Sequence, residues 1–155
     1  MIDVVDRETR SRMMSGIRAK NTRPELFIRI GLHALGFRYR LHAKDIPGKP
    51  DVVFPRYGAL VVVHGCYWHG HGCRYFKWPK SNEAFWKEKI SSNRKRDRVN
   101  LKLQEQLGWR TIVVWECAIR KNLIDQNFDV VDLVARWLTK DTRSAYLDES
   151  GVHSK

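Results

Sequence analysis

The sequence predicts an α/β fold in which helices flank a mixed central sheet. Segments of helical periodicity alternate with short runs rich in β-branched residues. One of these runs, residues 59–63, is apolar throughout, which is typical of a central strand buried on both faces. A long helical segment separates it from the next such run, and a crossover of this kind joins parallel strands. The 155 residues fit a single domain, residues 1–155.

The first regular element is a helix that begins at Thr22 and ends at Gly36. Thr22 can cap the helix, Pro24 is tolerated in its first turn, and Glu25 completes a capping box. Glycine commonly follows the last turn of a helix. Residues 37–41 then alternate between apolar and basic side chains, which predicts a half-buried strand.

A hairpin is expected next. Residues 51–54 predict a short strand that ends at Pro55, residues 56–58 a turn, and residues 59–63 the second strand, which runs into His64. The hairpin places the beginning of its first strand beside the end of its second strand.

The second half of the chain begins with a long helix over residues 82–107, which Ser81 or Asn82 can cap. One face is basic, and its apolar residues recur at helical spacing: Trp86, Ile90, Val99, Leu103 and Leu107. Residues 110–117 predict a strand and residues 128–138 a final helix. Residues 139–155 form a polar tail, which we expect to be loosely held, and residues 1–20 form a polar, basic N-terminal segment.

The predicted core order is αβββαβ, which is also the order of restriction-endonuclease-like nucleases. Fold order alone does not imply function. The charge is more informative, because 29 Lys and Arg against 17 Asp and Glu give a net charge of +12. Such an excess favours a polyanion partner, and nucleic acid is the usual one, although a merely solvated basic surface is the alternative. We find no secretory signal and no apolar run of about 18 residues, so we expect a soluble, intracellular protein.

The three cysteines indicate a metal site. Their odd number excludes a complete disulfide framework. Cys66 and Cys73 enclose His69 and His71 in a glycine-rich loop, and Cys117 lies further along the chain. Three thiolates and one imidazole would form a closed, structural zinc site. The spacing leaves open which histidine binds, and three buried, unreactive cysteines are the alternative.

A second group of residues predicts hydrolytic chemistry. Asp51, at the start of the hairpin, can hold Mg²⁺ through oxygen, and the carbonyl of Val63, His64 and His69 would converge on the same edge. Magnesium stabilises the charge that develops during phosphodiester hydrolysis, and a histidine can activate the attacking water. Each residue alone is more often an ordinary loop end or strand end, but their combination with the basic charge favours a catalytic site.

Aromatic residues in the cysteine loop predict contact with bases. Tyr67 and Trp68 lie between candidate zinc ligands, in a polar loop rather than on a periodic element. A rigid aromatic tip can wedge between base pairs, and a mismatch opens more cheaply than a paired step. Trp86 can join this wedge or pack on the core beside Phe85.

Taken together, these residues resemble the very-short-patch repair (Vsr) DNA mismatch endonucleases. The likeness extends from about residue 10 to about residue 120 and rests on Pro50-Asp51, residues 64–73, Phe85-Trp86, and residues 108–110 and 114–117. The resemblance implies a Mg²⁺-dependent enzyme that recognises T·G mismatches left by 5-methylcytosine deamination and nicks the strand 5′ of the mismatched thymine.

The resemblance also assigns roles to individual residues. It implies that Asp51 binds Mg²⁺, that His69 is the general base, and that His64 and Glu25 contact metal-bound waters. It further implies that a structural Zn²⁺ is bound by Cys66, His71, Cys73 and Cys117. The DNA contacts that it implies are Tyr67, Trp68, Trp86, Lys89, Asn93, Met14 and Ile17. Val63 stands where a family member has Thr, which still leaves a backbone carbonyl for the metal. The second acidic residue and the lysine of restriction-type nucleases are absent, which favours a histidine mechanism.

The expected partner is double-stranded DNA with a T·G mismatch, and other mismatch-repair proteins are candidate partners. We expect a monomer in the bacterial cytoplasm, associated with the nucleoid. Two alternatives remain: a zinc-stabilised DNA-binding module without catalysis, and a restriction endonuclease that makes double-strand breaks in fully paired DNA.

Overall fold

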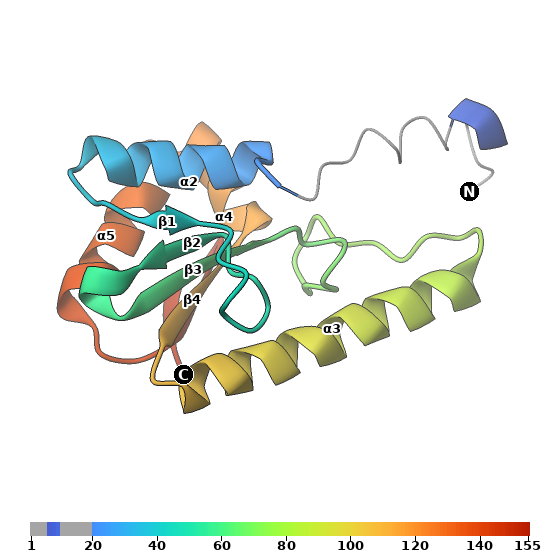
Figure 1. Ribbon diagram of the computed structural model, residues 1–155. Helices are drawn as coiled ribbons and strands as arrows, with labels where there is room; N and C mark the ends of the chain where they lie inside the picture. Colours follow the sequence, from blue (N-terminus) through green and yellow to red (C-terminus); the bar gives the residue numbers. More distant parts are fainter. Residues whose placement is uncertain (1–5, 10–19) are drawn as a thin grey trace.

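A six-stranded mixed sheet forms the centre of the protein, in a computed structural model that describes residues 6–9 and 20–155 (Figure 1). The strands lie in chain order: β1 (Arg40–Leu41), β2 (Val52–Phe54), β3 (Ala59–His64), β4 (Arg110–Trp115), β5 (Ala145–Asp148) and β6 (Gly151–Ser154). β3 pairs with β4 and β4 with β5 in parallel, and the other neighbours are antiparallel. The expected hairpin and the expected parallel crossover are therefore confirmed.

Helices cover both faces of this sheet. They are α2 (Arg23–Ala34), α3 (Glu83–Gln106), α4 (Glu116–Ile124) and α5 (Val130–Lys140), with a single 3₁₀ turn, η1 (Pro55–Tyr57), between β2 and β3. Figure 1 shows α3 as a long helix that extends well beyond the strands and alongside the loop that follows β3. No helix in residues 6–9 and 20–155 has the length and apolar character that a membrane span needs.

The alternation of side chains along β2 divides the core in two. Val52 and Phe54 pack in the larger cluster, with residues from α2, α4 and α5. Val53 faces the opposite side, where it packs in a smaller cluster with Ala43 and Ile46 from the loop before β2. Strands β3 and β4 lie in the middle of the sheet, as expected for the continuously apolar run.

The boundaries of α2 confirm Thr22 as the cap, although the Glu25 carboxylate accepts from the backbone N–H of Asn21 and not from that of Thr22. Thr22 accepts a hydrogen bond from the backbone N–H of Glu25 at 3.4 Å, and Gly36 follows the helix with a φ of +94°. Glycine reaches this left-handed conformation without steric cost. The strand expected over residues 37–41 is much shorter, because only β1 pairs with β2, and Phe37 and Tyr39 instead pack edge to face against Phe54.

The C-terminal region differs most from the expectation. The segment expected to be a loosely held tail contains β5 and β6, and Ala145 and Leu147 are fully buried. β4 also ends at Trp115, before an unpredicted helix, so Cys117 lies in the first turn of α4 and not on a strand. The segment 141–155 is rich in polar residues, and its two strands are too short to show a clear alternation of apolar and polar residues in the sequence.

The expected apolar face of α3 is mostly in solvent. Ile90 is buried, but Val99, Leu103 and Leu107 are 50%, 40% and 62% exposed. Gln104 takes the buried position instead: its side chain donates to the carbonyl of Pro47 at 2.7 Å and accepts from the hydroxyl of Thr111 at 3.0 Å. A polar side chain thus joins α3 to the loop before Asp51.

Candidate active site and metal centres

The end of β3 positions the residues expected to carry the chemistry. The carboxylate of Asp51 accepts a hydrogen bond from the backbone N–H of Val63 at 2.8 Å. His64 ends the strand, and the cysteine loop leaves from it. Parallel pairing with β4 places Trp115 opposite His64. Asp51 therefore lies beside the backbone of the strand end that carries His64.

Asp51 shares its site with Glu25 and His42, whose ligand atoms all lie within 4.8 Å of one another. Glu25 is 4% exposed. Its carboxylate accepts from the backbone N–H of Asn21 at 3.1 Å and lies 3.2 Å from Nε2 of His42. Burial, helped by the adjacent Glu25, raises the pKa of Asp51 to about 6, although the hydrogen bond from the N–H of Val63 acts to lower this pKa. Two neighbouring buried carboxyl groups favour the binding of a cation.

A second cluster joins His64, His69 and Asp97. The two imidazole rings stack with centroids 3.8 Å apart and 1° between their planes. Nδ1–H of His69 donates to the carboxylate of Asp97 at 2.6 Å, and Nε2 of His64 lies 4.0 Å from the other Asp97 oxygen. Burial, and then the neighbouring His69, lower the pKa of His64 to about 3, so His64 is neutral at pH 7.

A cavity of about 450 Å³ opens beside this second cluster. His64, His69 and Asp97 line one part of it, and Arg94 and Lys155 line another. The cationic side chains give the cavity the charge that an anionic substrate requires.

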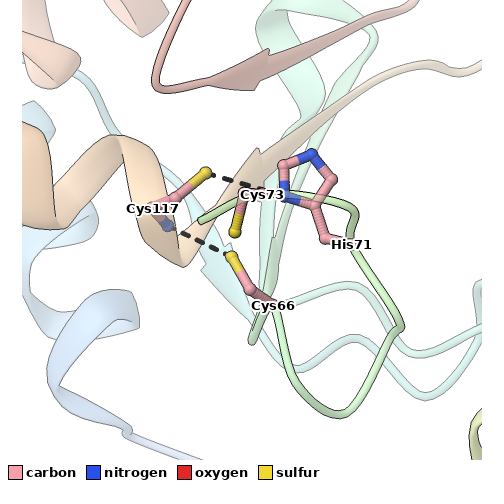
Figure 2. A group of neighbouring side chains, drawn as sticks. All are labelled: Cys66, His71, Cys73 and Cys117. Carbon is pink, nitrogen blue, oxygen red and sulfur yellow. Dashed lines mark hydrogen bonds between the residues drawn. The ribbon is translucent and has the colours of Figure 1, made fainter. Parts of the chain in front are cut away.

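The three cysteines and His71 form a third cluster, in which the candidate ligand atoms all lie within 4.8 Å of one another. Figure 2 shows Cys66, Cys73 and His71 of the loop facing Cys117 at the start of α4. The backbone N–H of Cys117 donates to the sulfur of Cys66 at 3.3 Å, and Sγ of Cys117 lies 3.6 Å from Nδ1 of His71. Four soft and borderline ligands that converge in this way fit a closed tetrahedral metal site.

The pKa shifts in this cluster favour ligation at Cys117 and His71, which bind a metal as thiolate and neutral imidazole, and oppose it at Cys66. The hydrogen bond with the Cys66 thiol lowers the pKa of Cys117 to about 7, and the same interaction followed by burial raises the pKa of Cys66. Burial lowers the pKa of His71, which keeps its imidazole neutral. Nδ1 of His71 faces the cysteines while Nε2 lies 3.9 Å from Asp148, and a carboxylate in this position orients a metal-bound imidazole.

The aromatic residues expected to form a wedge contact one another. The rings of Tyr67, Trp68 and Trp86 lie 5.4 to 5.6 Å apart, edge to face. Phe76 and Trp78 extend the cluster, and the sequence reasoning missed both. Trp78 is 46% exposed, so part of this aromatic surface is accessible.

The long helix α3 holds the loop in place. Asn93, expected to contact DNA, donates from its amide to the carbonyl of Trp68 at 2.9 Å, while Lys89 is exposed. Gly70 has a φ of +63°, and a Cβ there would lie 2.7 Å from a methyl group of Ile90. Only glycine allows the loop to pack this closely on the helix.

Most expected site residues are brought together, but in two groups rather than one. Asp51 lies with Glu25, whereas His64 and His69 lie with Asp97 on α3. The sequence reasoning missed His42, Asp97 and Asp148. Asp97 was detectable as the single acid within the basic run 94–98. Met14 and Ile17 lie outside the residues that the structure describes.

Comparison with known proteins identifies the family. The family described as DNA mismatch endonuclease Vsr matches residues 2–75. The Type II nicking enzyme V.XorIIP of Xanthomonas oryzae pv. oryzae (strain KACC10331 / KXO85) is 48% identical over 119 residues, which cover 77% of this chain and 88% of that protein. The DNA mismatch endonuclease Vsr of Escherichia coli (strain K12) is 37% identical over 155 residues, which cover 99% of this chain and 98% of that protein. The chain therefore belongs to the family of Vsr DNA mismatch endonucleases, hydrolases that act on phosphodiester bonds.

Proposed function

We propose that this protein nicks DNA at T·G mismatches, 5′ of the mismatched thymine, in a Mg²⁺-dependent reaction that begins very-short-patch repair. The observation that supports this proposal best is the arrangement at the end of β3. Val63 contacts Asp51, which lies with Glu25, and the next residue, His64, belongs to the cluster with His69 and Asp97. A carboxylate site for a hard cation and a candidate base beside a cationic cavity are the parts that phosphodiester hydrolysis needs.

Asp51 is the residue that would hold Mg²⁺, with the carbonyl of Val63 as a second oxygen and with Glu25 and His64 on bound waters. The donor set fits, because Glu25 is buried, Asp51 is largely shielded from solvent, and their proximity disfavours two negative charges without a cation. When bound, Mg²⁺ polarises the phosphate and stabilises the leaving oxygen.

His69 is the proposed general base. Its Nδ1–H donates to Asp97, which leaves the lone pair on Nε2 free to accept a proton from the attacking water. Asp97 fixes this tautomer and stabilises the imidazolium that forms, so Asp97 acts as a positioning residue. His64 is held neutral by burial and stacks on His69, where it fixes the plane of the base.

The cysteine cluster would hold a structural Zn²⁺ through Cys66, Cys73, Cys117 and His71, and so stiffen the loop that bears Tyr67 and Trp68. Tyr67, Trp68 and Trp86 are proposed to enter the base stack, which yields more easily at a mispair. Lys89, Asn93, Met14 and Ile17 are proposed to contact the DNA near the mismatch. We further propose a restriction-endonuclease-like fold in a single domain, and a cytoplasmic monomer that works with other repair proteins on nucleoid DNA.

The test compares a T·G duplex with its fully paired counterpart, with Mg²⁺ present and absent. The proposal predicts a single nick in the mismatched duplex, only with Mg²⁺. Asp51→Ala should abolish nicking while binding of the mismatched duplex persists, and Asp132→Ala, on the remote helix α5, should leave nicking unchanged. Binding without any nicking would favour the DNA-binding module, and double-strand cleavage of paired DNA would favour a restriction enzyme.

A further inference from the structure

The third member of the Asp51 cluster has no role in the proposed chemistry. Nε2 of His42 lies 3.2 Å from Oε2 of Glu25, and a ring nitrogen of His42 lies within 4.8 Å of a ligand oxygen of each carboxyl group. The His42 side chain is 18% exposed, and that of Glu25 is 5% exposed. An imidazole nitrogen is therefore presented to the same space as the carboxylates that are proposed to hold the cation.

The backbone holds His42 in this position at some cost. Its φ is +47°, in the left-handed region that non-glycine residues rarely occupy. The backbone N–H of His42 donates to the carbonyl of Asp51 at 3.1 Å. This hydrogen bond joins the residue after β1 to the residue before β2, and so holds His42 and Asp51 next to each other. Strained backbone conformations of this kind gather at sites that bind ligands.

We propose that His42 is a nitrogen ligand of the cation held by Asp51. A ring nitrogen of His42 would give its lone pair to the cation, with the ring proton carried on the other nitrogen, and the imidazole would complete a mixed set of one nitrogen and several oxygens. This inference rests on the proposed function only in taking Asp51 as the cation site.

The donor set determines which cations the site prefers. Sites made only of carboxylate, carbonyl and water suit Mg²⁺, Ca²⁺ and Mn²⁺ alike, whereas an imidazole nitrogen favours first-row transition ions, of which Mn²⁺ is the one that also accepts such oxygens, over Mg²⁺ and Ca²⁺. The site of this chain should consequently bind Mn²⁺ more tightly than an all-oxygen site does, and Mn²⁺ should support nicking at lower concentration than Mg²⁺.

The experiment measures Mn²⁺ bound to the zinc-loaded protein, without DNA, by electron paramagnetic resonance. In the unaltered protein, pulsed measurements should detect a directly bound ¹⁴N nucleus. His42→Gln keeps a hydrogen-bond donor for Glu25 but offers no imidazole nitrogen. It should abolish the ¹⁴N coupling and weaken Mn²⁺ binding at least about tenfold, since even outer-shell partners of metal ligands are typically worth 10–100-fold. His42→Asn tolerates the left-handed backbone and should give the same result if the glutamine variant folds poorly.

His33 provides the matched control, because it is an exposed histidine at the end of α2. His33→Gln should leave both the coupling and the affinity unchanged. The proposal is overturned if the unaltered protein binds Mn²⁺ without a coupled nitrogen, or if the coupling persists in His42→Gln. If Asp51→Ala leaves Mn²⁺ binding unaltered, the cation site of the proposed function is wrong, whereas loss of binding in Asp51→Ala but not in the His42 variants overturns only the role of His42.

Discussion

The buried carboxyl group of Asp51 should make the metal-free protein less stable than an asparagine variant. Asp51→Asn keeps an oxygen that can accept from the N–H of Val63, and its amide can donate to Glu25. The variant thus retains the polar contacts while it removes the charge. We expect the free energy of unfolding to rise, which is unusual for a substitution in a buried polar cluster.

The expected magnitude follows from the pKa of Asp51, which burial raises from 3.8 to about 6. Each pKa unit corresponds to about 1.4 kcal/mol, so the ionised group costs the folded protein about 3 kcal/mol above pH 6. Because the folded state holds the proton more tightly than the unfolded state, this cost declines as the pH falls through 6 and vanishes below about 4. Asp51→Asn should therefore be more stable by about 3 kcal/mol at pH 7.5 and nearly equal to the unaltered protein at pH 4.

Urea unfolding of both proteins, loaded with zinc but free of Mg²⁺, measures this difference at each pH. His64 has the opposite effect, because its lowered pKa means that the unfolded state takes up a proton first as the pH falls below 6.5. That contribution is common to both proteins and cancels in the difference. A variant that is equally or less stable at pH 7.5, or a gain that persists at pH 4, would refute the reasoning. Added Mg²⁺ should stabilise the unaltered protein more than the variant.

Three further outcomes are expected. Cys73→Ala should lower the zinc content well below one ion per chain by elemental analysis and lower the melting temperature together with nicking activity; full stability without metal would contradict a structural site. Gln104→Ala should cost about 2 kcal/mol in urea unfolding, because it leaves the carbonyl of Pro47 and the hydroxyl of Thr111 without their partner. Trp68→Ala should reduce nicking of a T·G duplex by about tenfold or more, since stacking on an aromatic ring contributes about 1–3 kcal/mol per base; an undiminished rate would argue against a wedge.

Local signals predicted the elements that depend on neighbouring residues. The capping residue Thr22 and the glycine after α2 predicted where this helix begins and ends, and the apolar run over residues 59–63 predicted a central strand. The structure confirms both predictions. The strands β5 and β6 carry no such signal. Each has four residues, and their stability depends on the pairing of β5 with β4, about thirty residues away in the sequence, to which β6 adds as the second strand of a hairpin.

The same distinction between local signals and tertiary contacts applies to the residues of the site. Cysteine spacing within one loop predicted the first ligands, and the structure brings Cys117 to them from another element. His42 and Asp97 were not recognised, because the strand bridge and the helix packing that bring them to the site are tertiary contacts. The apolar spacing of α3 was misleading for a related reason: tertiary packing turns Gln104 toward Pro47 and Thr111, which leaves Val99, Leu103 and Leu107 in solvent.

One short segment carries parts of both centres, because His69 lies between Cys66 and His71 in the loop after β3. Loss of a metal ion from the cysteine cluster would therefore loosen the turn that positions the His69 imidazole against Asp97. Nicking and thermal stability should consequently fall together when the cysteine cluster holds no metal.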